Sequence, residues 1–385
     1  MDIYTDVVIV GTGVGGLFAA LNIEPHKKVV LITKSDMESS DSFLAQGGIC
    51  VERDDDDYES YFEDTMKAGH YENRKESVDI MIRSSREIIS DLVSYGVEFE
   101  KENGEFIYTR EGAHSKPRIL YHEDVTGKEI TSKLLERAKE RDNISIYEYT
   151  VMTDILEENG RCIGILAEHE EEEWKIYAEN TILASGGIGG RYQHSTNFPH
   201  LTGDALDIGK KHGIRMEHLD YVQIHPTTLY SKKPGRRFLI SESVRGEGAV
   251  LYDKNGHRFV NELLPRDVVA EAIREQMKKD GTDHVWLSME HIPREDIAKH
   301  FPNICQHCQE EGYDVFKDWI PVVPAQHYFM GGIWVDSDSR TSMEHLYAVG
   351  ETSCNGVHGK NRLASNSLLE SMVFAKRAAK AIERA

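Results

Sequence analysis

A glycine-rich segment near the start of the chain carries residue types and spacing that suit phosphate binding. Asp6–Val10 predicts a strand that runs into the glycines of Gly11–Gly16 and then into a helix at Leu17–Leu21. A second strand predicted at Lys28–Thr33 completes a strand–helix–strand unit of the size that binds dinucleotides. Glycines at such a turn let backbone N–H groups at a helix N-terminus approach a pyrophosphate, which the helix dipole also attracts. We therefore predict a dinucleotide site here.

The end of the second predicted strand argues against an ordinary NAD site. Strand–helix–strand units that bind NAD place an Asp or Glu there to hold the adenosine ribose. This chain instead has Thr33-Lys34-Ser-Asp36. Lys34 in that place leaves the ribose contact to another group.

Two later segments repeat the pattern of a strand that ends in glycine. Residues 177–183 run into Ala-Ser-Gly-Gly, and residues 346–349 run into Gly350-Glu351. Strands that end in glycine near positions 11, 186 and 350 must converge if they serve one ligand. Such convergence is typical of a flavin-binding fold that both ends of the chain complete.

The middle of the chain predicts a second domain. Prolines interrupt the pattern there, and polar helices such as Asp267–Lys279 follow them. The predicted fold class is α/β: a Rossmann-like, glutathione-reductase-like FAD-binding domain formed by residues 1–218 and 329–385. Residues 219–328 would form an inserted α+β capping domain for the substrate.

Composition excludes several classes of protein. The chain has 385 residues, of which 39% are hydrophobic, and a net charge of −21. No apolar run approaches the roughly 20 residues of a membrane span, and the N-terminus lacks the basic and apolar regions of a signal peptide. We expect no membrane association and a cytoplasmic location. The acidic balance also argues against nucleic-acid binding, which needs clustered Lys and Arg.

The acidic runs and the cysteines have modest predicted roles. Residues 52–64 and 168–173 supply twelve of the net negative charges and are expected to be solvated surface segments.

The cysteine count is odd, which is typical of reduced thiols. Cys305 and Cys308 form a lone CxxC without two further zinc ligands at matching spacing. The sequence predicts a helical segment there, and no metal site.

The order of motifs along the chain identifies a family. The chain resembles the L-aspartate oxidases, which belong to the succinate dehydrogenase and fumarate reductase flavoprotein superfamily, over essentially its whole length. The stretch Arg110-Glu-Gly-Ala-His-Ser115 is the one that resembles aspartate oxidases specifically. The other motifs, shared by the superfamily, are Ser42–Gly48, His225–Thr228, Ser241–Gly248, Pro265–Asp267, His327–Gly332 and Gly359–Leu369.

The resemblance implies an FAD site, with Lys34 at the adenosine end, Asp204 and Glu351 near ribose and ribityl hydroxyls, and Ser367 and Leu368 beside the isoalloxazine. In membrane-bound relatives a His five residues before the Gln of Ala-Gln-Gly-Gly bonds covalently to the flavin. Asp41 stands at that position, so the FAD is expected to be non-covalent. The remaining residues expected to bind it are Gly11, Thr12, Gly13, Val14, Gly15, Gly16, Ser42, Phe43, Leu44, Ala45, Gln46, Gly47 and Gly48.

The resemblance also implies a dicarboxylate site. A buried dicarboxylate needs fixed cations, and arginine grips a carboxylate with two parallel hydrogen bonds. The family's substrate-facing arginines match Arg266, its proton donor in fumarate reduction, and Arg362. The predicted catalytic residues are Arg266, Glu242, His225 and His327. The predicted substrate-binding residues are Glu111, Arg362, His225, His327 and Thr227, with Glu111 expected to meet the ammonium group of aspartate.

Arg245 is a further candidate, although pairing with Glu242 or Glu247 explains it as well. The family's final helical bundle is expected to be absent, because the chain ends at Ala385, shortly after the helix predicted at Ser367–Ala379.

The implied reaction is oxidation of L-aspartate to 2-iminosuccinate, with oxygen or fumarate as acceptor, in the first step of de novo NAD (quinolinate) biosynthesis. The product would pass to quinolinate synthase. Two alternatives stay open: a soluble fumarate reductase or related dicarboxylate dehydrogenase, which shares every motif except the one with Glu111, and a non-catalytic flavin-binding or assembly subunit. The second is disfavoured because the site histidines and arginines are all present.

Overall fold

The first predicted strand belongs to β1 (Asp2–Val10), which lies between β2 (Val29–Ile32) and β10 (Glu172–Leu183) in a seven-stranded sheet. The computed structural model describes residues 1–384. β7 (Ile144–Tyr147) extends the sheet beyond β2, and β9 (Arg161–His169) and β8 (Thr150–Glu158) extend it as an antiparallel meander beyond β10.

The three strands that end in glycine are neighbours in this sheet. β10 pairs in parallel with β1 and also with β17 (Leu346–Ala348). Their carboxyl ends therefore lie at one edge, where Gly11, Gly186 and Gly350 follow them. The predicted convergence is confirmed.

Residues alternate along β1 between the two faces of the sheet, as a strand requires. Val7 and Ile9 belong to a core that includes α1 (Val14–Asn22) and α10 (Asn366–Arg384). Val8 and Val10 belong to a second core, which β8–β10 and α5 (Asp204–Lys211) share. The sheet is thus buried on both faces, which explains why β1 and β2 read as continuous apolar runs.

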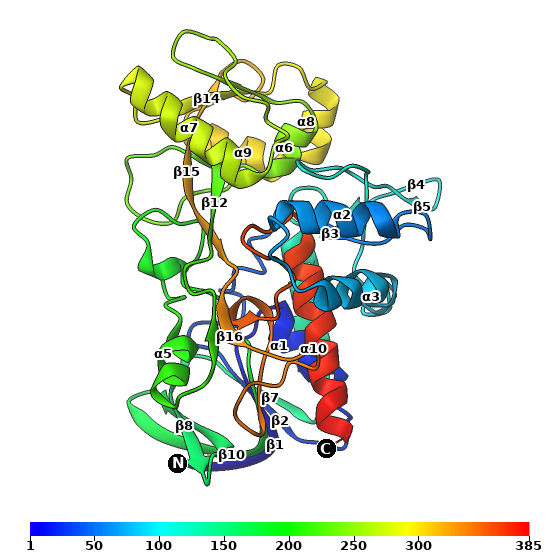
Figure 1. Cartoon of the computed structure of the whole chain (residues 1–385), viewed down its shortest axis with the longest axis vertical. Coiled ribbons are helices and arrows are strands. Elements are labelled where there is room, and N and C mark those ends of the chain that lie inside the picture. The colour runs from blue at the N-terminus through cyan, green and yellow to red at the C-terminus, as the bar shows by residue number, and fades with distance from the viewer. Residues whose placement is uncertain (385) are drawn as a thin grey trace.

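Helices that are far apart in the sequence pack against one another on the face of the sheet that carries Val7 and Ile9. α10 contacts α1 and α3 (Lys75–Ser94), and α1 contacts α4 (Thr126–Lys139). Figure 1 shows α10, the last helix, standing beside α1 near the start of the chain. The two ends of the chain therefore complete one domain.

A second lobe forms the upper part of Figure 1. It has its own core and a four-stranded antiparallel sheet in the order β12-β15-β14-β13. β12 (Val222–Leu229) enters this lobe and β15 (Ile320–Phe329) leaves it. The predicted boundary at 219 falls just before β12, and the one at 328 falls inside the end of β15. Its other elements are α6 (Glu242–Gly246), β13 (Val250–Tyr252), α7 (Arg266–Asp280), β14 (Val285–Ser288), α8 (Arg294–His300) and α9 (Pro302–Glu310).

Short elements connect the larger ones. They are β3 (Ile49–Cys50), α2 (Tyr58–Ala68), β4 (Lys101–Glu102), β5 (Glu105–Phe106), β6 (Ile119–Leu120), η1 (Gly189–Arg191), β11 (Met216–Glu217), β16 (Gly332–Trp334), η2 (Gly350–Thr352) and β18 (Ser353–Cys354). Cys305 and Cys308 lie on α9, where burial raises their pKa values to about 11 and about 12. In the described range 1–384, no helix is long and apolar enough to cross a bilayer.

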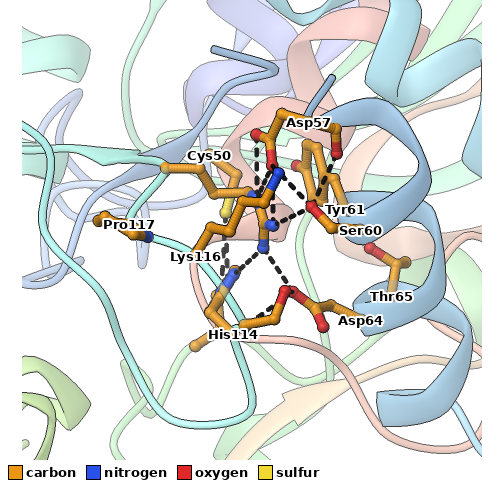
Figure 2. Close-up of polar contacts among 12 residues, drawn as sticks. Cys50, Asp57, Ser60, Tyr61, Asp64, Thr65, His114, Lys116 and Pro117 are labelled. Atoms are coloured by element: carbon orange, nitrogen blue, oxygen red, sulfur yellow. Dashed lines mark hydrogen bonds and ion pairs between the residues drawn. The ribbon is translucent and has the colours of Figure 1, made fainter. Parts of the chain in front are cut away.

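The acidic run at 52–64 differs from its prediction. Part of it forms α2, and Asp57 is buried rather than solvated. Arg118, whose side chain is completely buried, pairs with two acids of this run, Asp57 and Asp64, which Figure 2 labels. Its Nη2 is 3.0 Å from Asp57 Oδ1 and its Nη1 is 2.6 Å from Asp64 Oδ2. The run therefore contains a structural ion-pair cluster, because a buried guanidinium requires paired carboxylates.

We predict that Arg118→Met destabilises the protein by about 3–5 kcal/mol, because it leaves Asp57 buried without its cation. Urea unfolding followed by circular dichroism measures the loss. As a control, Lys133→Met removes a partly exposed pair with Glu136 on α4 and should change stability by less than about 1 kcal/mol. Equal effects of the two variants would contradict the structural role of the cluster.

Candidate active site

A cavity extends from the glycine loop after β1 to the first turn of α7 in the upper lobe. Its lining includes Gly11, Gly13 and Gly15 at one end and Arg266 at the other. The glycine edge of the main sheet and the upper lobe therefore share one cavity.

The glycine loop is packed too closely for side chains at two positions. A Cβ on Gly11 would lie 2.2 Å from the Ala184 carbonyl oxygen, and one on Gly16 would lie 2.0 Å from the Gly11 carbonyl oxygen. Gly11 also has φ +116°, which favours glycine. This packing presents the N-terminus of α1 to the cavity, so the dipole of the helix favours an anionic phosphate there.

Lys34 and Asp204 form an ion pair on the cavity wall. Lys34 Nζ donates to Asp204 Oδ2 at 2.7 Å and to Thr202 Oγ1 at 2.9 Å. The pair joins the end of β2 to the first residue of α5. The structure thus brings together Lys34, which the resemblance places at the adenosine end, and Asp204, which it places near the sugar hydroxyls.

Buried oxygen atoms without partners line the same region. Within residues 1–384, Asp41 Oδ2 and Gln46 Oε1 have no hydrogen-bond partner. Burial raises the pKa of Asp41 to about 7 and that of Glu351 to about 8. Glu351 Oε1 accepts one hydrogen bond, from the Phe329 N–H at 2.9 Å. Acceptors that lack donors suit a ligand rich in hydroxyl and N–H groups, so these residues and the glycine loop fit FAD.

Most of the predicted cofactor residues line the cavity, but three do not. Gly16, Phe43 and Gly48 do not line it; a Cβ on Gly48, for example, would meet the Leu120 carbonyl oxygen at 2.4 Å. These three pack behind the loops that do. The predicted residues on the wall are Gly11, Thr12, Gly13, Val14, Gly15, Lys34, Asp41, Ser42, Leu44, Ala45, Gln46, Gly47, Asp204, Glu351, Ser367 and Leu368.

Arg266 and Glu242 form a buried ion pair in the upper lobe. Each is the first residue of a helix, α7 and α6, and Arg266 Nε donates to Glu242 Oε2. Arg266 Nη1 also donates to Gln223 Oε1 at 3.0 Å. Burial tends to raise the pKa of Glu242, but the charges of Arg266 and Arg245 outweigh it and hold the pKa below its usual value. Glu242 is therefore a carboxylate that fixes the orientation of Arg266.

His225 and His327 lie with their ring centroids 5.0 Å apart on β12 and β15. Burial, followed by the charge of Arg266, lowers both pKa values well below the usual histidine value. His225 Nδ1 accepts the Thr227 N–H at 3.2 Å, which places the ring proton on Nε2. Nε2 has no partner within residues 1–384, so it can donate to a substrate carboxylate.

Arg362 completes the cationic end of the cavity. Its guanidinium lies 4.3 Å from the centroid of the Tyr328 ring, and its Nη1 donates to Ser367 Oγ at 2.6 Å. Burial, and then the charge of Arg266, lowers the pKa of Arg362 to about 10. It is still a cation at neutral pH, held rigidly against an aromatic face.

Two candidates lie outside the cavity. Thr227 was predicted to bind substrate, but its hydroxyl donates to the Ile240 carbonyl at 3.0 Å and it does not line the wall. Arg245 lies 3.5 Å from Glu242 Oε2 and donates to the Glu262 carbonyl, whereas Glu247 pairs with His300. Of the two pairings considered for Arg245, the structure shows the one with Glu242.

Glu111 brings a buried carboxylate to the same cavity. Its Oε1 accepts from Ser243 Oγ at 2.8 Å and its Oε2 accepts from Ser365 Oγ at 2.5 Å. Burial and the charge of Glu242 raise the pKa of Glu111. A Cβ on Gly47 would lie 2.3 Å from Glu111 Oε1, so glycine is needed there for the close approach.

Sequence reasoning missed the residues that orient this set. Gln223 Nε2 donates to the Asn361 side chain and to the Arg362 carbonyl, both at 2.8 Å, while its oxygen holds Arg266. Gln223 precedes His225 by two residues on β12, and this spacing was the available signal. Tyr328, Ser243 and Ser365 gave no signal of their own, although each lies inside or beside a motif.

Comparisons with known proteins agree with this geometry. The FAD binding domain family matches residues 6–368. The chain is 50% identical to the L-aspartate oxidase of Clostridium perfringens, over 97% of this chain and 85% of that protein. It is 47% identical to the L-aspartate oxidase of Clostridium acetobutylicum, over 99% of this chain and 88% of that one.

Among solved structures, a mutant form of E. coli quinol fumarate reductase FrdA superposes with a TM-score of 0.94 at 31% identity. It covers 100% of this chain, which spans 71% of that one. The glycine edge, the buried pair of arginine and glutamate, and these identities lead to one conclusion: the chain belongs to the L-aspartate oxidase family of FAD-binding proteins.

Proposed function

We propose that this protein uses FAD to oxidise L-aspartate to 2-iminosuccinate, with oxygen or fumarate as the final acceptor. The observation that carries the proposal is the carboxylate of Glu111, buried opposite the arginines in one cavity. The relatives named L-aspartate oxidase support it. When bound, FAD supplies the two-electron acceptor for the Cα–H bond.

The charges of the site match an amino dicarboxylate. Arg266 and Arg362 on the cavity wall and Arg245, buried beside Glu242 outside it, set against ionised Glu242 and Glu111, leave one positive charge. L-aspartate carries one net negative charge. Succinate or fumarate carries two, so its binding would require Glu111 to take up a proton, which the raised pKa of Glu111 favours. Because unpaired buried charges are strongly unfavourable, ionised Glu111 favours a substrate with an ammonium group.

The side chains have separate tasks in this proposal. Arg362 and the Nε2–H of His225 would hold the carboxylates, and Arg266 would bind the substrate beside the reacting carbons. Glu242 keeps Arg266 oriented through its Nε. In fumarate reduction, Arg266 would donate the proton to carbon, and the Glu242 carboxylate would assist by taking up a proton from solvent and passing it to Arg266.

A soluble fumarate reductase or dicarboxylate dehydrogenase is the second candidate, favoured by the FrdA superposition. Hydrogen peroxide formation with L-aspartate and with succinate separates the two functions. The first proposal requires peroxide from aspartate. A non-catalytic flavin subunit is disfavoured because His225, Arg266, His327 and Arg362 all line the cavity.

The proposal extends to the fate of the product. An imine hydrolyses in water, so 2-iminosuccinate would be consumed promptly by the next enzyme, quinolinate synthase, in de novo NAD biosynthesis. Direct hand-off and a cytoplasmic location stay predictions.

Glu111→Gln tests the basis of selectivity. It should lower kcat/KM for L-aspartate at least about 100-fold, because it removes a charged contact to the ammonium group, and fumarate reduction should change much less. Steady-state assays with each substrate measure both values. Glu105→Gln, on the exposed β4–β5 hairpin, is the matched control. Equal losses with both substrates would refute the ammonium contact.

The same variant has a pH signature. The charged groups that face Glu111 are Glu242, Arg266, Arg245 and Arg362. Because the pKa of Glu111 is raised, the carboxyl becomes neutral at a higher pH than an ordinary glutamate. In the wild type, kcat/KM for aspartate should therefore fall as the pH drops through that pKa. Glu111→Gln should lack this acid limb.

Arg266→Leu should reduce fumarate reduction by about 100-fold or more, the range of a lost general acid, with FAD still bound. The flavin absorbance of the purified variant measures binding, and oxidation of a reduced dye by fumarate measures turnover. Arg274→Leu, at a partly exposed position on the same helix, is the control. Retained fumarate turnover would remove Arg266 from the donor role.

Asp41 predicts how the FAD is held. A carboxyl stands where covalent relatives have histidine, so acid precipitation of the holoprotein should release yellow flavin into the supernatant. Flavin absorbance at about 450 nm, a property of the cofactor itself, is measured in the supernatant and in the pellet. Flavin that stays with the pellet would show a covalent bond.

A further inference from the structure

His114 connects Glu111 to the ion-pair cluster that Arg118 forms with Asp57 and Asp64. His114 is buried four residues before Arg118, in the same loop that carries Glu111. Figure 2 shows His114 near Cys50 and Asp64, and its two ring nitrogens contact Arg118 and Cys50. The predicted role of the cluster in stability does not explain what this ring does.

The contacts of His114 define its tautomer. Arg118 Nη1 lies 3.1 Å from His114 Nδ1. A guanidinium only donates hydrogen bonds, so Nδ1 accepts and the ring proton is on Nε2. Nε2 lies 3.0 Å from the Ala364 carbonyl oxygen and donates to it. Burial, followed by the charge of Arg118, lowers the pKa of His114 to about 4, so the ring is neutral at physiological pH.

The acceptor of that hydrogen bond is adjacent to the residue that holds Glu111. Ala364 precedes Ser365, whose Oγ donates to Glu111 Oε2 at 2.5 Å. Ser365 has φ +63°, and Ala113, beside His114, has φ +64°. The left-handed region is unfavourable for both residue types by about 1–2 kcal/mol. Both conformations therefore need surrounding contacts to persist.

Two residues next to the cluster, Cys50 and Tyr61, supply those contacts on the Ser365 side. The Cys50 N–H donates to the Ser365 carbonyl at 3.0 Å, and the Tyr61 hydroxyl donates to Asn366 Oδ1 at 2.7 Å. On the loop side, the His114 ring provides the link to the Ala364 carbonyl. One imidazole thus ties together two strained segments that meet at the Glu111 carboxylate.

We infer that His114 is a positioning residue for substrate selectivity: its Nε2–H, fixed by Arg118, holds Ser365 against Glu111 and so aims the Glu111 carboxylate at the substrate ammonium. The inference rests on the proposed role of Glu111. His114 lies outside the cavity lining and does not touch the substrate. Its effect therefore appears in selectivity between substrates.

His114→Leu and His114→Gln, assayed as holoproteins, test this. Leu removes both hydrogen bonds, and the ratio of kcat/KM for L-aspartate to that for fumarate should fall about tenfold, mainly through a higher KM for aspartate. Gln can donate to Ala364 and accept from Arg118, so it should restore most of the ratio. His122→Leu, in which an exposed ring contacts the Glu98 carbonyl, is the matched control. An unchanged ratio, or no rescue by Gln, would overturn the inference.

A double-mutant cycle separates this inference from the proposed function. In a Glu111→Gln background, His114→Leu should reduce the ratio by less than about twofold, because the two residues act as one unit. If the losses caused by His114→Leu and Glu111→Gln multiply in the double variant, the inference is overturned but the proposed function is not. If Glu111→Gln itself leaves the ratio unchanged, the ammonium contact of the proposed function fails, and the inference fails with it.

A measurement on the wild-type holoprotein covers the case in which His114→Leu does not fold. With 15N-labelled histidine, the His114 resonances, assigned with His114→Gln, should show a proton on Nε2 only, without titration between about pH 6 and pH 8. A ring protonated on Nδ1, or one that titrates in that range, would overturn the inference.

Discussion

The buried ion pair between Arg266 and Glu242 is the interaction on which the site depends. A cavity that binds a dicarboxylate must hold several guanidinium groups out of water, and these repel one another. Burial lowers the pKa of Arg362 most, and the charge of Arg266 lowers it further, which reflects that repulsion. Glu242 lies within 3.5 Å of Arg245 and bonds directly to Arg266. The negative charge of Glu242 thereby offsets the repulsion among these guanidinium groups before any substrate enters.

The pair also explains the placement of the helices around it. Glu242 and Arg266 are the first residues of α6 and α7, so their side chains project from helix ends toward the cavity. Ser241 caps α6, and its Oγ accepts the Ser243 N–H. The upper lobe supplies this pair, whereas Arg362 and Glu111 come from the FAD-binding lobe. Only the contact between the lobes assembles the complete charge set.

Local patterns in the sequence were sufficient for the cofactor end of the fold. A glycine that follows an apolar strand predicts both the strand and its exposed turn, and three such strands are neighbours in the sheet. The resemblance gave Thr227 a substrate contact, but Thr227 does not line the cavity. On a regular strand it would face the same way as His225, but the register shifts between His225 and Thr228. Such a bulge re-aims a side chain, and Pro226, which lies at the shift, is its local signal.

Long-range pairing limited the prediction elsewhere. Asp57 sits in a run of acids that is typical of solvated surface, and its partner Arg118 lies 61 residues away. Gln223 holds Arg266 from a distance of 43 residues. A sequence pattern reports the period of burial along one element, but it does not report which side chain of another element closes a hydrogen-bond network. The polar residues that orient the site belong to this second kind.

The anchoring of Glu111 connects selectivity to the joining of the two lobes. Its carboxylate accepts from Ser243 of α6 in the upper lobe and from Ser365, just before α10, in the lower one. Two fixed donors on different oxygens leave little rotational freedom to the group, and both must be in place for it to point at an ammonium. A lobe displaced from this arrangement would keep the carboxylate but lose its direction. If Glu111 binds the ammonium group as proposed, the preference for an amino dicarboxylate depends on this arrangement of the lobes, since neither lobe holds the Glu111 carboxylate from both sides by itself.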